Sequence, residues 1–357
     1  MDGVDLVLAS FPRGKPQVIC TCEQSWPEEI LPQLHGLCSP SFGETETMGE
    51  VSCSISRIFA RGVEKLLEKA RISPSEVTAI GSHGQTIRHH PDRGYSWQLG
   101  CGALLSELTG IDVICDFRSA DIAAGGEGAP LVPAFHNWVF RHPGILRFIV
   151  NIGGIANVSV LDPGKKQVIG FDTGPGNTLL DCCTRKFWHE PCDKNASHAR
   201  QGTVNRQFLQ ILLQHPYLAR SYPKSTGRET FTWEFVEECL RGLPERIKEE
   251  DILRTLSAYT SLTIAREVCN IAGTASYEVY ICGGGSHNPV ITEDLDTYLK
   301  GCCRFGDTGL LGADPDFVEA LAFAWLAYRF TARLPGNLPE ATGAYKPKIL
   351  GCLYPSS

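Results

Sequence analysis

The chain has 357 residues, which is long for a single core, so more than one lobe is expected. Hydrophobic residues make up 43% and charged residues 20%, a composition typical of a globular protein. The formal net charge of −7 and the lack of any basic tract argue against nucleic acid or an anionic membrane surface as a partner. The longest apolar runs are far too short to span a bilayer, so membrane insertion is not expected.

Fifteen cysteines are a high count, but their placement indicates free thiols. They stand inside apolar runs, as Cys115 and Cys282 do, or as neighbours, as Cys182 and Cys183 do, and no C-x-x-C zinc knuckle occurs. The opening residues have neither the basic start nor the long apolar region of a signal peptide. We therefore expect reduced, mostly buried thiols in a cytoplasmic protein.

The first part of the chain predicts short strands that end in polar loops. Apolar residues at helical spacing predict a helix over 53–70. Two polar loops, Ser82–Thr86 and Asp116–Asp121, each follow a short apolar strand. Because functional loops follow the carboxyl ends of strands in α/β sheets, both are candidate site segments. The glycine-rich segment 123–130 is interpreted as the passage between two lobes. The strands expected here are 4–10, 17–22, 77–81 and 111–115.

The second part predicts a hairpin with glycine-rich loops. Asn151–Asn157 and Gly170–Asn177 should lie at opposite ends of this strand pair. Glycines let backbone N–H groups approach an anion, and the second loop adds one carboxylate, so phosphate and metal chemistry is favoured over an ordinary turn. The expected strands are 145–150, 158–161, 168–171 and 277–282, and the expected helices are 204–214, 233–240, 251–272 and 317–333.

A further glycine loop, Gly283–Gly285, precedes Asn288 and Pro289, which mark a helix N-terminus suited to anion or nucleotide contact. No Walker loop occurs, and no G-x-G-x-x-G follows a strand to open a helix, so P-loop and Rossmann folds are disfavoured. The N-terminal hairpin, Asn151–Asn157 and Gly283–Gly285 are instead three separate loops at strand ends. Three such loops on one cleft are typical of the actin–hexokinase–Hsp70 class of ATP-binding folds.

Several long motifs, spread over nearly the whole chain, have counterparts in one known family. They are Ser82–Thr86, Asp116–Arg118, Asn151–Asn157, Phe171–Asn177, Pro223–Glu229, Cys282–Pro289 and Thr342–Ala344. In these segments the chain resembles the anhydro-N-acetylmuramic acid kinases, a family that also contains levoglucosan kinases. The resemblance implies two α/β lobes around a central cleft, each with a mixed five-stranded sheet of the ribonuclease-H-like kind, and a homodimer. The expected division is a sugar-side lobe over 1–130, a nucleotide-side lobe over 131–334 and a tail over 335–357.

A 1,6-anhydro sugar has its O6 locked in an internal ether, so it offers no hydroxyl for an ordinary kinase to phosphorylate. The resemblance implies a general base that activates water for attack on C1, while O6 leaves and takes the γ-phosphoryl group of ATP. The products would be N-acetylmuramic acid 6-phosphate and ADP. Asp172, in the family's Asp-Thr-Gly-Pro-Gly-Asn motif, is the candidate base, and a turn-forming role is its alternative.

Five residues are candidates for the sugar side. Arg118 should pair with the lactyl carboxylate through its planar fork, although it is also suited to a lobe-closing ion pair. Asp121 either supports Arg118 or contacts sugar hydroxyls. His83 and Gln85 are suited to sugar oxygens, with a capped loop histidine as the alternative. Glu319 matches a family glutamate near the sugar, but it also suits the first turn of a helix.

The resemblance also implies a set of residues for ATP, and Mg²⁺ because phosphoryl transfer needs its charge neutralised. Gly153 and Gly154 should face the phosphates, and Gly283–Gly285 the adenosine side. The full set is Asp2, Gly3, Asp5, Asn151, Gly153, Gly154, Asn157, Gly174, Gly176, Asn177, Gly283, Gly284, Gly285 and Asn288.

The start of the chain departs from the family pattern. The family has a full strand and a Gly-Thr-Ser-x-Asp-Gly phosphate loop before Val-Asp, whereas Met1 here falls inside that loop. We therefore expect a truncated N-terminal strand, with an internal methionine assigned as the start. The candidate functions are the muramic-sugar kinase, a levoglucosan kinase, and a truncated sugar-binding protein with little kinase activity. Asp172 favours a kinase, and Arg118 favours the muramic sugar.

Overall fold

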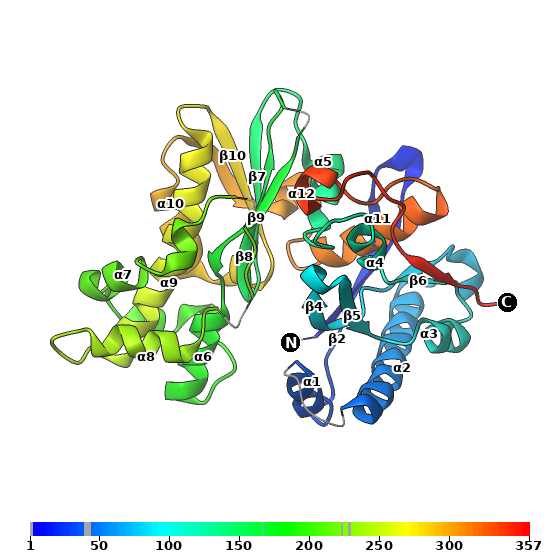
Figure 1. Cartoon of the computed structure of the whole chain (residues 1–357), viewed down its shortest axis with the longest axis horizontal. Coiled ribbons are helices and arrows are strands. Elements are labelled where there is room, and N and C mark those ends of the chain that lie inside the picture. Colours follow the sequence, from blue (N-terminus) through cyan, green and yellow to red (C-terminus); the bar gives the residue numbers. More distant parts are fainter. Residues whose placement is uncertain (1–2, 39–43, 166, 223, 228–229) are drawn as a thin grey trace. The chain divides into compact units, whose positions relative to one another are not determined.

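A computed structural model (Figure 1) describes residues 3–38, 44–165, 167–222, 224–227 and 230–357. The chain divides into two compact units, and each is described by itself. Unit 1 consists of Met1–Val139 with Phe317–Ser357, and unit 2 of Phe140–Asp316.

Unit 2 is built on a mixed five-stranded sheet, as the family resemblance implies (Figure 1). Its order is β11-β10-β7-β8-β9; β10 is parallel to β7 and β11, whereas β8 is antiparallel to both of its neighbours. All six residues of β10 are buried, as expected for a strand covered on both faces. The strands are β7 (Leu146–Ile152), β8 (Ile155–Leu161), β9 (Ile169–Pro175), β10 (Tyr277–Cys282) and β11 (Cys302–Asp307).

A long buried helix, α9 (Glu249–Ala272), packs against β7, β8 and β9. Its apolar residues are spread around much of its circumference because other helices cover its far side. The core between helix and sheet includes Phe148, Val150, Phe171, Tyr259, Ile264 and Val279. The surrounding helices are α6 (Thr178–Trp188), α7 (Arg206–Leu212), α8 (Trp233–Arg241) and α10 (Pro289–Tyr298).

Unit 1 does not contain the predicted five-stranded sheet among its described residues. Its strands form three small sheets, β1-β2, β12-β6-β3 and β4-β5. Helix α11 packs on both β1 and β3, but the two strands share no backbone pairing, so the sheet is interrupted between them. The strands are β1 (Val4–Ser10), β2 (Gln17–Gln24), β3 (Ile80–Gly81), β4 (Gln85–His90), β5 (Tyr95–Leu99), β6 (Val113–Cys115) and β12 (Cys352–Tyr354).

The helices of unit 1 cover these small sheets. Helix α2 buries Ile55 and Ile58 in one apolar cluster with Leu34, and Val63 and Leu67 in a second with Ile111. It begins eight residues before the predicted helix over 53–70. The helices are α1 (Leu31–Leu37), α2 (Thr45–Ala70), α3 (Gly102–Thr109), α4 (Ser119–Ile122), α5 (Val132–Phe140), α11 (Val318–Thr331) and α12 (Pro339–Thr342).

The division into units differs from the expected ranges 1–130, 131–334 and 335–357. Most of α5 and all of α11 belong to unit 1, because the Trp325 ring of α11 lies 6.0 Å from Phe135 and 5.7 Å from Trp138. The tail is also part of unit 1, where β12 pairs with β6. The segment 123–130 is not the passage between units, since the chain passes from one to the other near 139 and again near 316.

All fifteen cysteines are free thiols, as predicted, but the expectation that most are buried is wrong. Only Cys183, Cys239 and Cys282 are buried, while Cys352 is one of several that are exposed. In the part of the chain that the structure describes, each helix is either too short or too polar to cross a bilayer.

Candidate active site

The two glycine-rich loops of the hairpin in unit 2 lie at the same end of the sheet. The prediction that they lie at opposite ends is wrong, because β9 runs antiparallel to β8 and returns to the turn from which β8 starts. The backbone N–H of Gly176 donates to the carbonyl of Gly154 (2.9 Å), and that of Asn177 donates to Gly153 (2.8 Å). The end of β9 is therefore tied directly to the β7–β8 turn.

The third glycine loop reaches this end of the sheet as well. Strand β10 is parallel to β7, with Cys282 opposite Asn151, so Gly283 follows at the same level. Gly283 has a φ of 79°, and a Cβ there would lie 2.3 Å from Oδ1 of Asn151. A Cβ at Gly176 would likewise lie 2.2 Å from the carbonyl oxygen of Gly153. Glycine is required at both positions because the loops approach one another so closely.

We call these three loops the glycine cradle (151–154, 174–178 and 283–286). The cradle is open on one side. A Cβ at Gly284 would meet nothing closer than Nδ2 of Asn177 at 3.9 Å, and one at Gly153 nothing closer than a carbonyl at 3.5 Å. The hydroxyls of Thr178 and Ser286 are buried and have no hydrogen-bond partner among the described residues. Unpaired donors beside exposed backbone fit an anionic ligand such as a phosphate.

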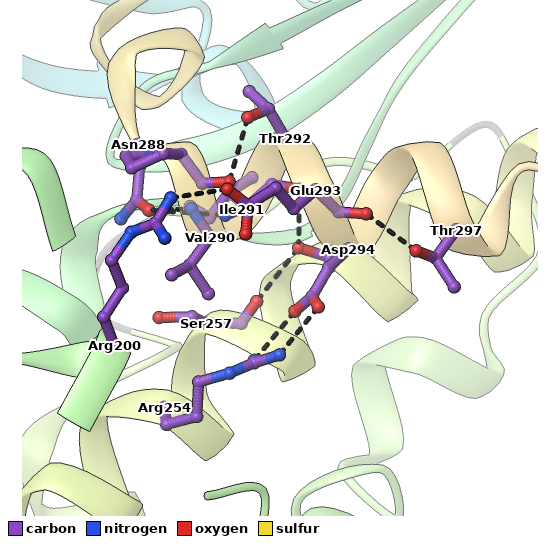
Figure 2. Close-up of polar contacts among 12 residues, drawn as sticks. Arg200, Arg254, Ser257, Asn288, Val290, Ile291, Thr292, Glu293, Asp294 and Thr297 are labelled. Carbon is purple, nitrogen blue, oxygen red and sulfur yellow. Dashed lines mark hydrogen bonds and ion pairs between the residues drawn. The ribbon is translucent and has the colours of Figure 1, made fainter. Parts of the chain in front are cut away.

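Helix α10 begins directly behind the third loop, and its start is fixed as the sequence predicts. Oδ1 of Asn288 accepts from the backbone N–H groups of Val290 (3.1 Å) and Ile291 (3.3 Å), and Pro289 occupies the first turn (Figure 2). Arg254 of α9 pairs with both carboxylate oxygens of Asp294, at 2.7 and 2.8 Å, as Figure 2 shows. This bidentate pair fixes α10 on the central helix.

Asp172 lies on β9, two residues before the cradle. Its Oδ2 accepts hydrogen bonds from the backbone N–H of Thr226 (2.9 Å) and the hydroxyl of Ser225 (3.1 Å). Burial raises the pKa of Asp172 above its usual value, and these two hydrogen bonds oppose the rise. Asn157 is directly opposite Asp172 in the β8–β9 pair, so the two side chains share one face. Ser225 and Thr226 lie in a motif that the sequence singles out, but their contact with Asp172 was not predicted.

In unit 1, Arg118 is held by two hydrogen bonds. Its Nη1 donates to the carbonyl of Gly128 (2.7 Å) and its Nη2 to Nε2 of His83 (2.8 Å), while its Nε is buried without a partner among the described residues. Burial and the charge of Arg118 lower the pKa of His83 to about 3. His83 is therefore neutral and acts as an acceptor that orients the guanidinium.

Asp121 lies in α4, three residues after Arg118, and is fully buried. It accepts from the backbone N–H of Gly128 (2.8 Å), from Nδ2 of Asn337 (2.6 Å) and from the hydroxyl of Thr342 (2.7 Å). Gly128 in turn accepts a hydrogen bond from Arg118, so Asp121 holds the loop that orients the arginine. Since Asp121 is also fully buried, a role in supporting Arg118 is favoured over contact with sugar hydroxyls.

The other two sugar-side candidates differ in whether they act on Arg118. Glu319 is exposed in the first turn of α11, and its charge acts on Arg118, which it helps to keep protonated against burial. Gln85 starts β4 and donates to the carbonyl of Thr86 (3.3 Å); it makes no hydrogen bond to His83 or Arg118 among the described residues. The structure therefore groups three of the predicted residues around Arg118 but leaves Gln85 apart.

The N-terminal candidates belong to unit 1, whereas the glycine cradle belongs to unit 2. Asp2 lies outside the described residues. Gly3 is exposed just before β1, and Asp5 pairs with Glu23 across the hairpin.

Unit 2 thus combines a glycine cradle whose chemistry suits an anion with a half-buried carboxylate, as expected of an enzyme that transfers phosphoryl groups. Comparison with known proteins gives the family. A model of the family described as "Anhydro-N-acetylmuramic acid kinase" matches residues 1–356. The protein of that name from Shewanella oneidensis is 45% identical over 353 residues, which cover 98% of this chain and 95% of that protein. Its counterpart from Shewanella pealeana is 45% identical over 358 residues, covering 100% and 96%.

Among solved structures, the activator of the 2-hydroxyisocaproyl-CoA dehydratase from Clostridium difficile, with bound ADPNP, has a TM-score of 0.45 at 14% identity, covering 89% of this chain and 88% of that one. Component A of the (R)-2-hydroxyglutaryl-CoA dehydratase from Acidaminococcus fermentans has a TM-score of 0.46 at 12% identity, covering 93% and 100%. The match of the family model and the identity to the curated relatives decide the assignment. The chain belongs to the anhydro-N-acetylmuramic acid kinase family, and it is a kinase.

Proposed function

We propose that this kinase hydrolytically opens 1,6-anhydro-N-acetylmuramic acid and phosphorylates its O6, giving N-acetylmuramic acid 6-phosphate and ADP. The observation that carries the proposal is the half-buried Asp172 carboxylate, held by two hydrogen bonds beside the glycine cradle. A carboxylate whose pKa is raised by burial is a stronger base than one in water, which suits proton abstraction from a water molecule. The family of the chain supports the same reaction.

The proposed reaction forms one bond to carbon and one to phosphorus. Asp172 takes a proton from a water molecule, and the water oxygen attacks C1 of the sugar. The C1–O6 bond breaks, and O6 forms a bond to the γ-phosphorus as the bond between that phosphorus and the β–γ bridging oxygen breaks. A single base suffices because the phosphoryl group captures the leaving oxygen, so no second carboxylic acid needs to protonate it.

A kinase of this family uses ATP as the phosphoryl donor, and the glycine cradle is the proposed site of its phosphates. The unpaired hydroxyls of Thr178 and Ser286 and the open side at Gly153 and Gly284 support this placement. The described residues contain no cluster of three acidic, histidine or cysteine side chains that could hold a metal. We therefore expect Mg²⁺ to be bound chiefly through phosphate oxygens and water.

On the sugar side, Arg118 is proposed to bind the lactyl carboxylate. Its Nε is buried and unpaired among the described residues, and its other two nitrogens are oriented by Gly128 and His83. A preoriented guanidinium favours a carboxylate ligand, so the muramic sugar is preferred to levoglucosan, which lacks one. A cytoplasmic homodimer remains part of the proposal.

The test is a coupled ADP-release assay of the full chain with ATP, Mg²⁺ and either 1,6-anhydro-N-acetylmuramic acid or levoglucosan. The proposal predicts ADP release with the muramic sugar and a sugar 6-phosphate in equal amount, identified by phosphorus NMR and mass spectrometry. ADP release without phosphosugar would contradict it, and turnover of levoglucosan alone would replace the sugar. Binding of the sugar by calorimetry without any turnover would leave only a sugar-binding protein.

A further inference from the structure

Lys224 is an unusual residue in unit 2 because its charged side chain is completely buried. Its Nζ lies 5.8 Å from the ring centre of Phe171 and 5.2 Å from that of Tyr217. Its Nζ also donates to Oε1 of Glu267 at 2.6 Å. A buried ammonium is costly unless it is paired, so this ion pair and the two aromatic faces define where the lysine must lie.

The residues around Lys224 are also those around Asp172. The carbonyl of Lys224 accepts from the backbone N–H of Asp172 (3.2 Å), and the next two residues, Ser225 and Thr226, bind its carboxylate. Tyr217, one of the two rings beside the ammonium, donates its hydroxyl to the carbonyl oxygen of Asp172 (2.8 Å). The segment 224–226 therefore holds both the backbone and the side chain of the candidate base.

Glu267 gives this segment a rigid support. It belongs to α9, the central helix of unit 2, which also packs on β9, the strand that carries Asp172. The side chain of Glu267 is about one-fifth exposed and lines a cavity of about 430 Å³, so water reaches one side of the pair. A single ion pair thus connects the buried helix to the loop that binds Asp172.

We propose that the Lys224–Glu267 ion pair positions the catalytic base: it holds Ser225 and Thr226 in place so that they bind and orient the Asp172 carboxylate. This inference rests on the proposed role of Asp172. Lys224 is a positioning residue, because its Nζ binds Glu267 and it acts on Asp172 through Ser225 and Thr226.

Electrostatics provides a test that separates positioning from a simple effect of charge. Among the residues that the structure describes, the charged and titratable groups around Asp172 and the Lys224–Glu267 pair are Tyr217, Arg220, Lys224 and Glu267. Neutralising Glu267 removes a negative charge, which alone would lower the pKa of Asp172. If the ion pair positions Ser225 and Thr226, the same change loosens the hydrogen bonds that lower this pKa, and the pKa rises instead.

The experiment compares Lys224→Met, Lys224→Arg and Glu267→Gln with the full wild-type chain. Arg147→Met is the matched control, because it breaks another largely buried ion pair of unit 2, with Glu278 (2.7 Å), at the opposite end of β7 from the cradle. The measurements are kcat, KM for the muramic sugar and for ATP, the pH dependence of kcat/KM, the melting temperature, and a carbon-13 NMR titration of the Asp172 carboxyl.

The proposal predicts that Lys224→Met lowers kcat about 10- to 100-fold, as expected for a misplaced base, with KM for ATP changed less than about threefold. Lys224→Arg should recover most of the loss. Arg147→Met should lower the melting temperature but keep kcat. Glu267→Gln should raise the pKa of Asp172. Wild-type kcat in folded Lys224→Met, or a lowered Asp172 pKa in Glu267→Gln, would overturn the proposal.

Two further results remain decisive. If Lys224→Met does not fold, Glu267→Gln and Lys224→Arg still give the NMR titration and kcat. If wild type turns over neither anhydro sugar, the proposed function has failed, whereas the titration of Asp172 in Glu267→Gln still supports or overturns the positioning role by the direction of its shift.

Discussion

The backbone N–H of Thr226 lies 2.9 Å from Oδ2 of Asp172 and donates a hydrogen bond to it. This contact joins a loop to the strand that carries the proposed base, and Ser225 adds its hydroxyl at 3.1 Å. Burial raises the pKa of Asp172, and these two donors lower it. The strength of the base is therefore a balance that single substitutions can shift in a known direction.

Replacing Ser225 by alanine removes one of the two donors. The pKa of Asp172 should rise, so the acid limb of the kcat/KM profile moves to higher pH, while the rate on the alkaline plateau changes little. Ser276→Ala, at an exposed position of the same unit, is the control and should leave the profile in place. An acid limb that stays at its wild-type pH in Ser225→Ala would show that the hydroxyl does not tune the base.

The raised pKa of Asp172 has a consequence for stability. In the unfolded chain this carboxyl loses its proton at a lower pH than in the folded chain. Its negative charge therefore begins to oppose folding above the ordinary pKa of 3.8, and the loss of stability is complete above the pKa of the folded protein. Asp172→Asn should therefore have a higher free energy of unfolding than wild type at pH 7. The difference should shrink as the pH falls towards 3.8. Urea denaturation of both chains across this pH range measures it, and a variant less stable at pH 7 would contradict the assignment.

Arg118 should discriminate between the two anhydro sugars. Arg118→Lys keeps the charge but loses the planar fork, so KM for 1,6-anhydro-N-acetylmuramic acid should rise about 10- to 100-fold while activity towards levoglucosan changes little. Arg88→Lys, which alters a buried arginine that pairs with Glu44 in the same unit, is the control for general damage. Equal losses on both sugars in Arg118→Lys would speak against carboxylate recognition.

Both carboxylate oxygens of Asp121 accept hydrogen bonds, Oδ2 from Gly128 and Oδ1 from Asn337 and Thr342. In Asp121→Asn the amide nitrogen must replace one of these acceptors and face a donor, so unit 1 should be destabilised by about 1–3 kcal/mol. Because Gly128 also accepts from Arg118, KM for the muramic sugar should rise. Asp112→Asn weakens another tail contact, with Ser356, but not the Gly128 loop, so it should spare KM. Steady-state kinetics measure KM, and urea denaturation measures stability. A KM for the muramic sugar that is unchanged in Asp121→Asn would show that Asp121 does not support Arg118.

Much of unit 2 follows from local sequence signals. The buried strand over 277–282 and the helix start at Asn288 and Pro289 were predicted correctly, because an apolar run and a polar cap followed by proline are local patterns. The glycine loops were recognised, but their common end was not, since it depends on the direction in which β9 pairs with β8.

The contacts that support the site depend on tertiary structure and could not be predicted. Lys224 and Glu267 are 43 residues apart, and Asp121 and Thr342 are 221 apart, so no periodicity relates either pair. The interrupted sheet of unit 1 and the placement of α11 there likewise depend on packing between distant segments. In unit 1 the short strand β3 begins three residues later than predicted, since its pairing with β6 starts only at Ile80.

The role of Asp172 as the general base is the central claim. Its most direct test is ADP release by wild type and Asp172→Asn, at equal concentrations of folded protein, with ATP, Mg²⁺ and 1,6-anhydro-N-acetylmuramic acid. We predict that the variant binds the sugar with unchanged affinity and that its turnover falls about 10²- to 10⁴-fold. Turnover within a few-fold of wild type would contradict the account, because the water would then be activated by another group.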